Sequence, residues 1–325
     1  MVSMRKLIFV LLLVAGCTGR QVRPGIVQAR AAPSDGTVRF IALGDTGMGS
    51  KGQYKVADAM AKVCGERGCD FVVLLGDNIY MSGVSGADDP QWRDKFEQPY
   101  AALQLPFWAA LGNHDYGNNG LGNDFNRPEG ELAYAQRQDR FKLPARRYHF
   151  AQGPAEFFFI DTNAARWGKD ESQGAEVAAW FAASKAPWKI AISHFPYRSN
   201  GPHGNAGDYE PGPGKRKKFG DDRVATGAAV KELLDATVCG KADLYFSGHD
   251  HSRQWLTEPC GGTTELLISG AGFETTPVTP RNPAHFAAAT LGFVYVSLSA
   301  TELQADFVDE NGKTEFTRTL KKSAP

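Results

Sequence analysis

The fold is decided by the stretch Phe71-Val72-Val73-Leu74-Leu75-Gly76-Asp77-Asn78-Ile79-Tyr80. Its first five residues are apolar without alternation, which is typical of a strand buried on both faces of a sheet. Gly76 permits a sharp turn, so Asp77 is expected at the carboxyl end of this strand, where open α/β sheets bind ligands. Taken alone, the segment also fits a buried strand followed by an ordinary Asp-Asn turn.

Four other predicted strands end in the same way, each with a polar side chain able to bind a metal. They are Thr37–Leu43 before Asp45, Pro106–Leu111 before Asn113-His114-Asp115, Trp188–Ser193 before His194, and Leu244–Ser247 before His249-Asp250-His251. Because the carboxyl ends of parallel strands meet at one edge of a sheet, we expect these side chains to form one site.

Helices are predicted between these strands, which favours parallel pairing with right-handed crossovers. Their expected ranges are Tyr54–Cys64, Pro90–Tyr100, Glu131–Phe141, Ala175–Lys185 and Thr226–Ala236. After Gln254 the pattern changes to short strands separated by turns. We expect these strands, Thr264–Ser269, Gly292–Ser299, Glu302–Val308 and Lys313–Leu320, to form a second, antiparallel sheet.

The composition excludes some classes of partner. Lys plus Arg and Asp plus Glu both number 36, so no overall positive charge favours nucleic acid, and we expect no nucleic-acid partner. A basic run, Lys215 to Lys218, lies in a long polar loop; it fits a solvated surface or a rim that attracts phosphate.

The N-terminus predicts export. Arg5-Lys6 precedes a short apolar run, which is the pattern of a signal peptide over residues 1–16. Val14-Ala15-Gly16-Cys17 resembles a bacterial lipobox, so we expect a lipid on Cys17, a flexible tether over 17–36 and a single catalytic domain over 37–322. An ordinary signal peptide with an accidental Cys is the alternative. A lipoprotein of the outer membrane, periplasm or cell surface is the expected location, and we expect a monomer.

Four cysteines remain beside Cys17, and an exported protein favours disulfides between them. Pairs local in sequence are preferred, namely Cys64 with Cys69 and Cys239 with Cys260. A zinc site is the alternative, although these spacings match no tight zinc pattern.

Together the five strand ends offer carboxylate, imidazole, amide and phenol ligands, a set that suits borderline or hard metals. The number of ligands exceeds what one tetrahedral ion needs, which favours two metals sharing a carboxylate.

With this set the chain resembles the metallophosphoesterases, and within them the purple acid phosphatases, most closely the small tartrate-resistant type. Five blocks in the family's order carry the resemblance: Asp45-Thr46-Gly47, Gly76-Asp77-Asn78-Ile79-Tyr80, Gly112-Asn113-His114-Asp115, Ala191-Ile192-Ser193-His194 and Gly248-His249-Asp250-His251. Thr46 and Ala191 depart from the family's usual Trp and Val, and neither position supplies a ligand.

The resemblance implies a four-layer α/β/β/α sandwich of two mixed sheets flanked by helices. It also implies a binuclear centre of Fe(III) with a divalent ion, which is iron, zinc or manganese. It implies that Asp77 bridges the metals, that Asp45, Tyr80 and His251 hold the ferric ion, and that Asn113, His194 and His249 hold the divalent ion. The implied reaction is hydrolysis of phosphate monoesters by a metal-bound hydroxide, with His114 as proton donor and His203 as a second substrate-binding residue.

Simpler interpretations remain for the single residues. His194, His249 and His251 also fit buried hydrogen-bonded histidines, Tyr80 a pocket-lining aromatic, and His203 a loop residue without a role. His149 and His285 belong to no motif. Alternative functions are a phosphodiesterase or nucleotidase of the same superfamily and a lipoprotein that binds iron or phosphate without turnover.

Overall fold

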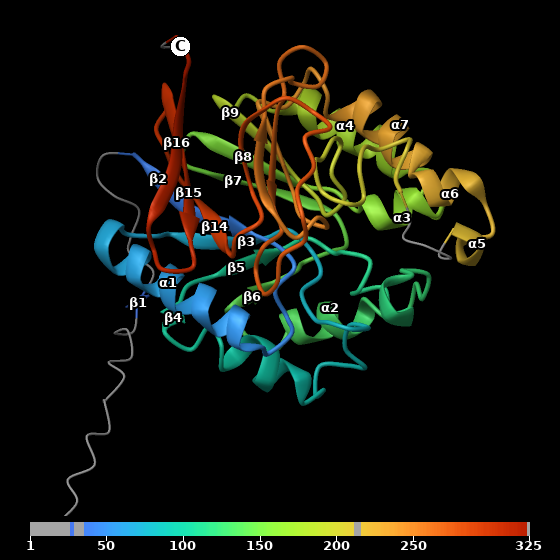
Figure 1. Cartoon of the computed structure of the whole chain (residues 1–325), viewed down its shortest axis with the longest axis horizontal. Coiled ribbons are helices and arrows are strands. Elements are labelled where there is room, and N and C mark those ends of the chain that lie inside the picture. The colour runs from blue at the N-terminus through green and yellow to red at the C-terminus, as the bar shows by residue number, and fades with distance from the viewer. Residues whose placement is uncertain (1–26, 29–35, 211–215, 324–325) are drawn as a thin grey trace, which may run out of the picture.

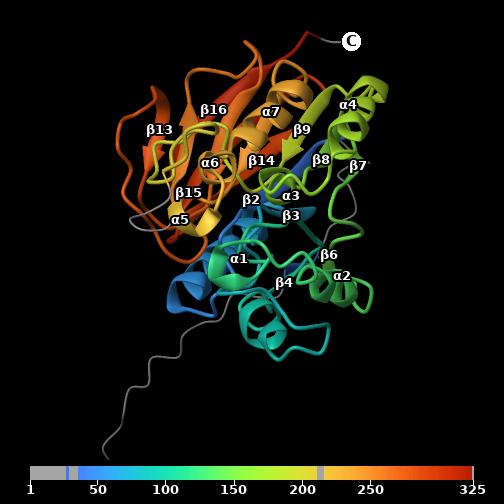
Figure 2. The ribbon, with the colours of Figure 1, turned by 90° about the vertical axis from the view of Figure 1, so that its right-hand side faces the viewer.

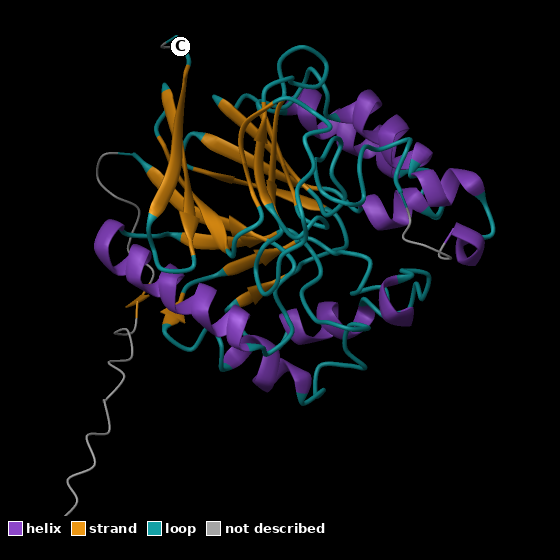
Figure 3. Ribbon diagram, in the orientation of Figure 1, coloured by secondary structure: helices purple, strands orange, loops and turns teal. Residues whose placement is uncertain are grey.

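The structure is a computed structural model that describes residues 27–28, 36–210 and 216–323. Two seven-stranded sheets pack face to face, and helices cover the outer face of each (Figure 1, Figure 2, Figure 3). The predicted sandwich of two mixed sheets flanked by helices is therefore confirmed. The predicted signal peptide and Cys17 lie outside the described residues. Within the predicted tether, β1 (Val27–Gln28) pairs with β4 (Leu103–Gln104).

The first sheet has the strand order β16-β15-β14-β2-β3-β5-β6. Its strands are β2 (Val38–Leu43), β3 (Phe71–Leu74), β5 (Phe107–Ala109), β6 (Phe141–Lys142), β14 (Gly292–Leu298), β15 (Glu302–Asp309) and β16 (Thr314–Lys321). The strands β2, β3, β5 and β6 are parallel, whereas β14, β15 and β16 extend the sheet from β2 in antiparallel fashion.

The second sheet has the order β13-β11-β12-β10-β9-β8-β7. Its strands are β7 (Tyr148–Gln152), β8 (Ala155–Phe159), β9 (Trp188–Ile192), β10 (Leu244–Ser247), β11 (Arg253–Leu256), β12 (Glu265–Ser269) and β13 (Ala284–Ala288). Four neighbours, β8, β9, β10 and β12, are parallel, and antiparallel strands complete both sides.

The prediction that the C-terminal strands form one antiparallel second sheet is wrong. The strand β12 pairs in parallel with β10, and β14 pairs with β2 in the other sheet. Both strands are apolar and almost wholly buried, which suits interior positions in a sheet but does not specify the strand with which each one pairs.

The helices differ from the predicted ranges mainly at their ends. They are α1 (Lys51–Arg67), α2 (Glu129–Ala135), α3 (Thr162–Arg166), α4 (Gln173–Ala183), α5 (Arg216–Phe219), α6 (Asp222–Thr226) and α7 (Ala228–Thr237), with a π-helical segment η1 (Arg93–Glu97) and a 3₁₀ turn η2 (Asn118–Gly120). The helix α1 starts early because the Ser50 hydroxyl accepts a hydrogen bond from Gln53 N at 3.3 Å and caps its N-terminus.

Two predicted helices are shorter than expected. Of Pro90–Tyr100 only η1 is regular, and Glu131–Phe141 ends as a helix at Ala135. The reason is Phe141, which enters β6 and packs its ring against Trp92 and Phe96, at centroid distances of 5.0 and 5.3 Å. Burial of this aromatic ring outweighs the helical preference of the segment.

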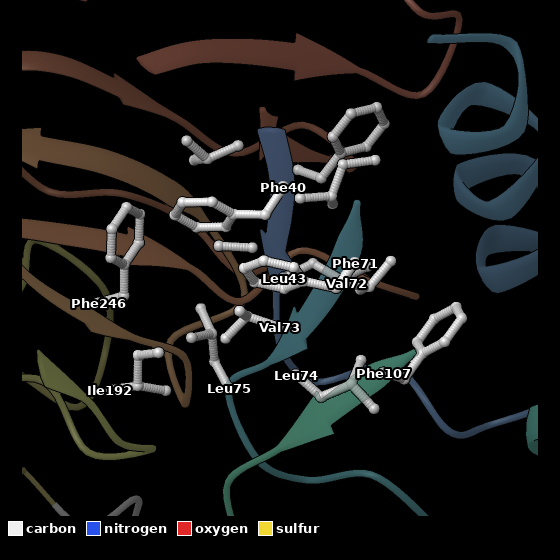
Figure 4. Packing of buried hydrophobic residues seen from close by; sticks show 14 of the residues in the cluster. Phe40, Leu43, Phe71, Val72, Val73, Leu74, Leu75, Phe107, Ile192 and Phe246 are labelled. Atoms are coloured by element: carbon white, nitrogen blue, oxygen red, sulfur yellow. The ribbon is translucent and has the colours of Figure 1, made fainter. Parts of the chain in front are cut away.

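The main core lies between the sheets, and aromatic rings join them (Figure 4). Phe40 of β2 stacks on Phe71 of β3 at 5.4 Å and meets Phe157 of β8 edge to face at 5.2 Å. These contacts fix β2, β3, β8 and their neighbours against one another, and so fix the relative positions of the loops that follow the strands.

Both preferred disulfides are present. Cys64–Cys69 joins the end of α1 to the residues before β3, and Cys239–Cys260 joins the end of α7 to the turn before β12.

Candidate metal centre

The loops after β2, β3, β5, β9 and β10 meet at one edge of the sandwich. Asp45, Asp77 and His249 each take a positive φ, of 56°, 54° and 68°. This backbone region is uncommon for residues with a side chain, and it concentrates at functional sites. Asp45 N donates to Gly76 O at 3.0 Å, so the first two loops hold each other in place.

A first cluster of ligand atoms surrounds the Tyr80 hydroxyl. Its oxygen lies 2.9 Å from Asp45 Oδ1, 3.0 Å from Asp77 Oδ2 and 3.1 Å from His251 Nε2. The other ring nitrogen of His251, Nδ1, lies 3.1 Å from Glu274 Oε1. A proton on Nδ1 would face the Glu274 carboxylate, and in that tautomer the lone pair of Nε2 points into the cluster.

A second cluster surrounds His194 Nε2. Asn113 Oδ1 lies 2.9 Å away, His249 Nδ1 3.1 Å and Asp77 Oδ2 3.3 Å. The other ring nitrogen of His194 lies 2.9 Å from Leu75 O, a carbonyl to which it must donate its proton. In the neutral imidazole Nε2 therefore carries a lone pair, and two of its neighbours are oxygen acceptors. His249 Nδ1 adds a third lone pair in the tautomer that carries its proton on Nε2.

The two clusters share one atom, Asp77 Oδ2. A cation at the centre of each cluster would be held by all of these oxygen and nitrogen atoms at once, whereas the single Tyr80 proton can be donated to only one acceptor at a time. The donor chemistry therefore fits two metal ions joined by Asp77. Three of the donors, from Asp77, His194 and His249, lie within 4.8 Å of one another and are buried.

The pKa values show a negative potential in this region. Burial opposes charge on His194, but the Asp77 carboxylate outweighs it and raises the pKa of His194 to about 9. Burial also opposes charge on His251, yet Asp45 and Glu274 raise its pKa to about 10. A site that stabilises a positive charge on these imidazoles also attracts metal cations.

Tyr80 and His249 are shifted toward their neutral forms. Burial, followed by the charges of Asp45 and Asp77, raises the pKa of Tyr80 well above its usual value. Burial, followed by the neighbouring His203 and His194, lowers the pKa of His249. A neutral imidazole is the form that binds metals, so His249 is suited to ligation.

His114 and His203, the two residues predicted to contact substrate, lie on opposite sides of the clusters. The His114 ring packs against the Tyr80 ring at a tilt of 41°, with centroids 4.2 Å apart, and its backbone N–H donates to Asp77 Oδ1 at 2.7 Å. His203 lies over His249 at 4.1 Å. Both line a cavity of about 260 Å³ at the surface of the centre. His149 and His285 do not line it; His149 pairs instead with Glu156 at 2.7 Å.

Sequence reasoning assigned no role to several residues around the site. Asp115 accepts hydrogen bonds from the backbone N–H groups of Asn78, Ile79 and Gly112, at 2.8, 3.1 and 2.8 Å, and so shapes two of the ligand loops. Asp115 belongs to a quoted block, so its position was a signal for this role. Glu274 and Arg166 belong to no motif, and only the fold brings them to the cavity. Lys215 and the side chains of 216 and 217, in the basic run, lie outside the described residues.

The comparisons with known sequences agree on one family of proteins. A model of the calcineurin-like phosphoesterases matches residues 38–253. Purple acid phosphatase 17 of Arabidopsis thaliana is 31% identical over 74% of this chain and 70% of its own length. The tartrate-resistant acid phosphatase type 5 of Sus scrofa is 26% identical over 93% of both chains. Among solved structures, GAP50 of Plasmodium, described as the anchor in the inner membrane complex, superposes with a TM-score of 0.68 at 23% identity, over 89% of this chain and 90% of its own; that likeness shows the fold alone.

Proposed function

Since this chain belongs to the calcineurin-like phosphoesterases, and within them to the purple acid phosphatases, we propose that it is a binuclear acid phosphatase of phosphate monoesters. The observation that carries the proposal is the position of Asp77 Oδ2, which lies 3.0 Å from Tyr80 Oη and 3.3 Å from His194 Nε2. One carboxylate oxygen thus belongs to two ligand sets, as a bridged pair of metals requires.

The proposed metal sites differ in their ligands. Asp45, Tyr80 and His251 would hold a ferric ion, and Asn113, His194 and His249 would hold a divalent ion of iron, zinc or manganese. When bound, the two ions would polarise the phosphoryl group and lower the pKa of a water molecule that serves as nucleophile. The ligand set supports this division because the only phenol lies in the first cluster and the only amide in the second.

His114 is proposed as the proton donor to the leaving group. Its Nδ1 lies 2.6 Å from Met81 O, which fixes a proton on that nitrogen and turns Nε2 away from the carbonyl. Nε2 packs close to Gly120, which has a φ of +78°; a Cβ there would lie 2.4 Å from it. Gly120 therefore leaves the space in which the imidazole can stand, and Nε2 is available to carry the transferred proton.

His203 is proposed to bind the phosphoryl oxygens. Its backbone N–H donates to Asp250 Oδ1 at 3.0 Å, and its ring lies on the ring of His249. The side chain is thus held above the second cluster on the side opposite His114. A substrate between the two histidines would have its phosphoryl group over the metals.

The decisive experiment combines metal content, visible spectrum and turnover for the soluble form that begins at residue 18. We expect two metals per chain, one of them iron, and a charge-transfer band that Tyr80→Phe removes. Tyr100→Phe, a buried tyrosine outside the cavity, is the matched control and should keep the band.

Turnover separates the alternatives. We expect kcat/KM to be higher for monoesters than for diesters and activity to persist below neutral pH. Faster cleavage of diesters without the band would favour the phosphodiesterase alternative. Two bound metals without turnover of either ester would favour a binding protein.

Membrane attachment is proposed through Cys17 rather than through a helix. Within the described residues, no helix has both the length and the apolar character needed to cross a bilayer. We propose that residues 1–16 are removed, that Cys17 carries a lipid, and that 37–322 form the catalytic domain. Mass spectrometry of the N-terminal peptide should show the added lipid, and Cys17→Ser should abolish it; an unmodified Cys17 in the exported protein would contradict the anchor.

A further inference from the structure

A buried arginine that has no acidic partner among the described residues lies at the edge of the cavity. Arg166, the last residue of α3, is 6% exposed and lines the same cavity as His114 and His203. Sequence reasoning gave it no role.

The contacts of Arg166 leave its charge uncompensated. Its Nε donates to Val224 O at 2.7 Å and its Nη2 to Ala225 O at 3.3 Å. Its guanidinium carbon lies 4.9 Å from the ring centre of Phe195, 4.4 Å from that of Phe219 and 5.7 Å from that of Tyr209. Among the described residues no carboxylate pairs with it, and outside them Asp35 is the only acidic side chain.

A second buried arginine, in contrast, has an acidic partner. Arg253 is 0% exposed, and its Nη2 pairs with Glu315. Buried charges are generally paired in this way, because an uncompensated charge removed from water is costly. Carbonyls and aromatic faces reduce that cost for Arg166 but supply no negative charge. An anion entering the cavity would supply it.

Arg166 stands on the side of the cavity formed by the second ligand cluster. The Phe195 ring that contacts Arg166 also meets the His249 ring at 4.5 Å, and Tyr209 contacts both. The guanidinium is therefore one aromatic ring away from a proposed metal ligand. It has five N–H donors in a planar fork, of which two are used by Val224 and Ala225.

We propose that Arg166 binds a second anionic group, carried by the leaving group of the substrate. The preferred substrates would then be phosphate esters whose leaving group bears a carboxylate or a second phosphate. The fork geometry of arginine suits both groups. This inference rests on the proposed phosphatase function, which it refines.

The test uses three esters that differ at one position. They are phenyl phosphate, 3-carboxyphenyl phosphate and 1,3-phenylene bisphosphate, each assayed with the metal-loaded enzyme and its Arg166→Met and Arg166→Lys variants. We expect Arg166→Met to lower the selectivity for the two doubly anionic esters over phenyl phosphate by about 10- to 100-fold, the usual size of a lost charged hydrogen bond. The lysine variant should recover part of the selectivity. The ester that loses more identifies which anion the subsite prefers.

The matched control is Arg140→Met. Arg140 also donates to a backbone carbonyl, Tyr100 O at 2.7 Å, and faces aromatic rings, but it lies outside the cavity. Its replacement should leave the selectivity unchanged. A parallel loss on all three esters in the Arg166 variants would overturn the proposal and make Arg166 a structural residue that anchors α6.

Failure of the proposed function would be recognised separately, because the unmodified enzyme would then hydrolyse none of the esters. In that case calorimetry would measure the binding affinities of phenylphosphonate and 3-carboxyphenylphosphonate, and so test the anion subsite without turnover. Tighter binding of the second compound that depends on Arg166 would support the subsite, and equal binding would exclude it.

Discussion

The two sheets contribute different chemistry to the centre. The loops after β2, β3 and β5 supply every predicted oxygen ligand, namely Asp45, Asp77, Tyr80 and Asn113. The loops after β9 and β10 supply every predicted nitrogen ligand, namely His194, His249 and His251. Each cluster draws from both sheets, because Tyr80 meets His251 and Asn113 meets His194. The centre therefore lies at an interface between the two sheets.

The oxygen ligands and the nitrogen ligands, which form the two halves of the centre, are also supported differently. On the oxygen side a buried carboxyl, Asp115, collects three backbone N–H groups, and Asn78 connects it to Glu131. On the nitrogen side Asp250 accepts the His203 N–H, and aromatic rings surround His249. Hydrogen bonds thus fix the oxygen ligands, whereas the imidazoles are held both by hydrogen bonds, such as that of His194 Nδ1 to Leu75 O, and by ring packing.

The difference between the two halves is tested most directly by removing one ligand from each half. Asp77→Ala should lose both metals and all detectable turnover, because its oxygen belongs to both clusters. His249→Ala should lose only the divalent ion. Metal content per chain measures the difference, with the exposed Asp88→Ala as control. Full metal content in Asp77→Ala would contradict the bridging role.

Removal of the metals should weaken the contact between the halves. A ligand at 1,000 times its dissociation constant stabilises a folded protein by about 4 kcal/mol, so chelation should lower the melting temperature by several degrees. Calorimetry before and after chelation, and after metal is returned, gives the size of the effect. Equal melting temperatures would show that the sheets hold the ligands together without the ions.

The two carboxyl groups that support the ligands, Asp115 and Asp250, allow a smaller difference between the halves to be tested. Asp115→Asn replaces an oxygen that accepts backbone N–H groups, so metal affinity should fall by about 10- to 100-fold, as for other residues that orient ligands. Asp250→Asn should affect metal affinity less and KM more, since its partner is His203. Titration of apoenzyme with metal, together with steady-state kinetics, separates the two. Equal losses of affinity would show that the halves are supported alike.

The last comparison concerns pH and Asp161, which caps α3 on the nitrogen side. Burial raises the pKa of Asp161 from 3.8 to about 6, so between these values the folded state binds more protons than the unfolded state. The free energy of unfolding should therefore fall as pH rises from about 4 to 6, by about 3 kcal/mol. Asp161→Asn should reduce this slope in urea titrations, whereas the exposed Asp88→Asn should keep it in full; burial also raises the pKa of Asp250 to about 6, so part of the slope remains. An unchanged slope in Asp161→Asn would assign it to another group.

The strand ends were predictable because their signal is local: an apolar run, a glycine and a metal-binding side chain. The structure brings Asp45, Asp77, Tyr80, Asn113 and the three histidines together, and their roles as ligands stay predictions. The sheet partners of β12 and β14 were not predictable, because an apolar strand does not specify its neighbour. Arg166 and Glu274 carry no local pattern, and their place at the cavity depends on contacts between distant segments.

The pairing of β2 with β14 has a consequence for synthesis. Ala42 lies opposite Val294, about 250 residues later in the chain. At a typical rate of roughly 5–20 residues per second, β2 leaves the ribosome on the order of 10 to 50 seconds before its antiparallel neighbour. During that interval one edge of β2 is open to other strands, and the nascent chain depends on chaperones or delayed folding to remain unpaired.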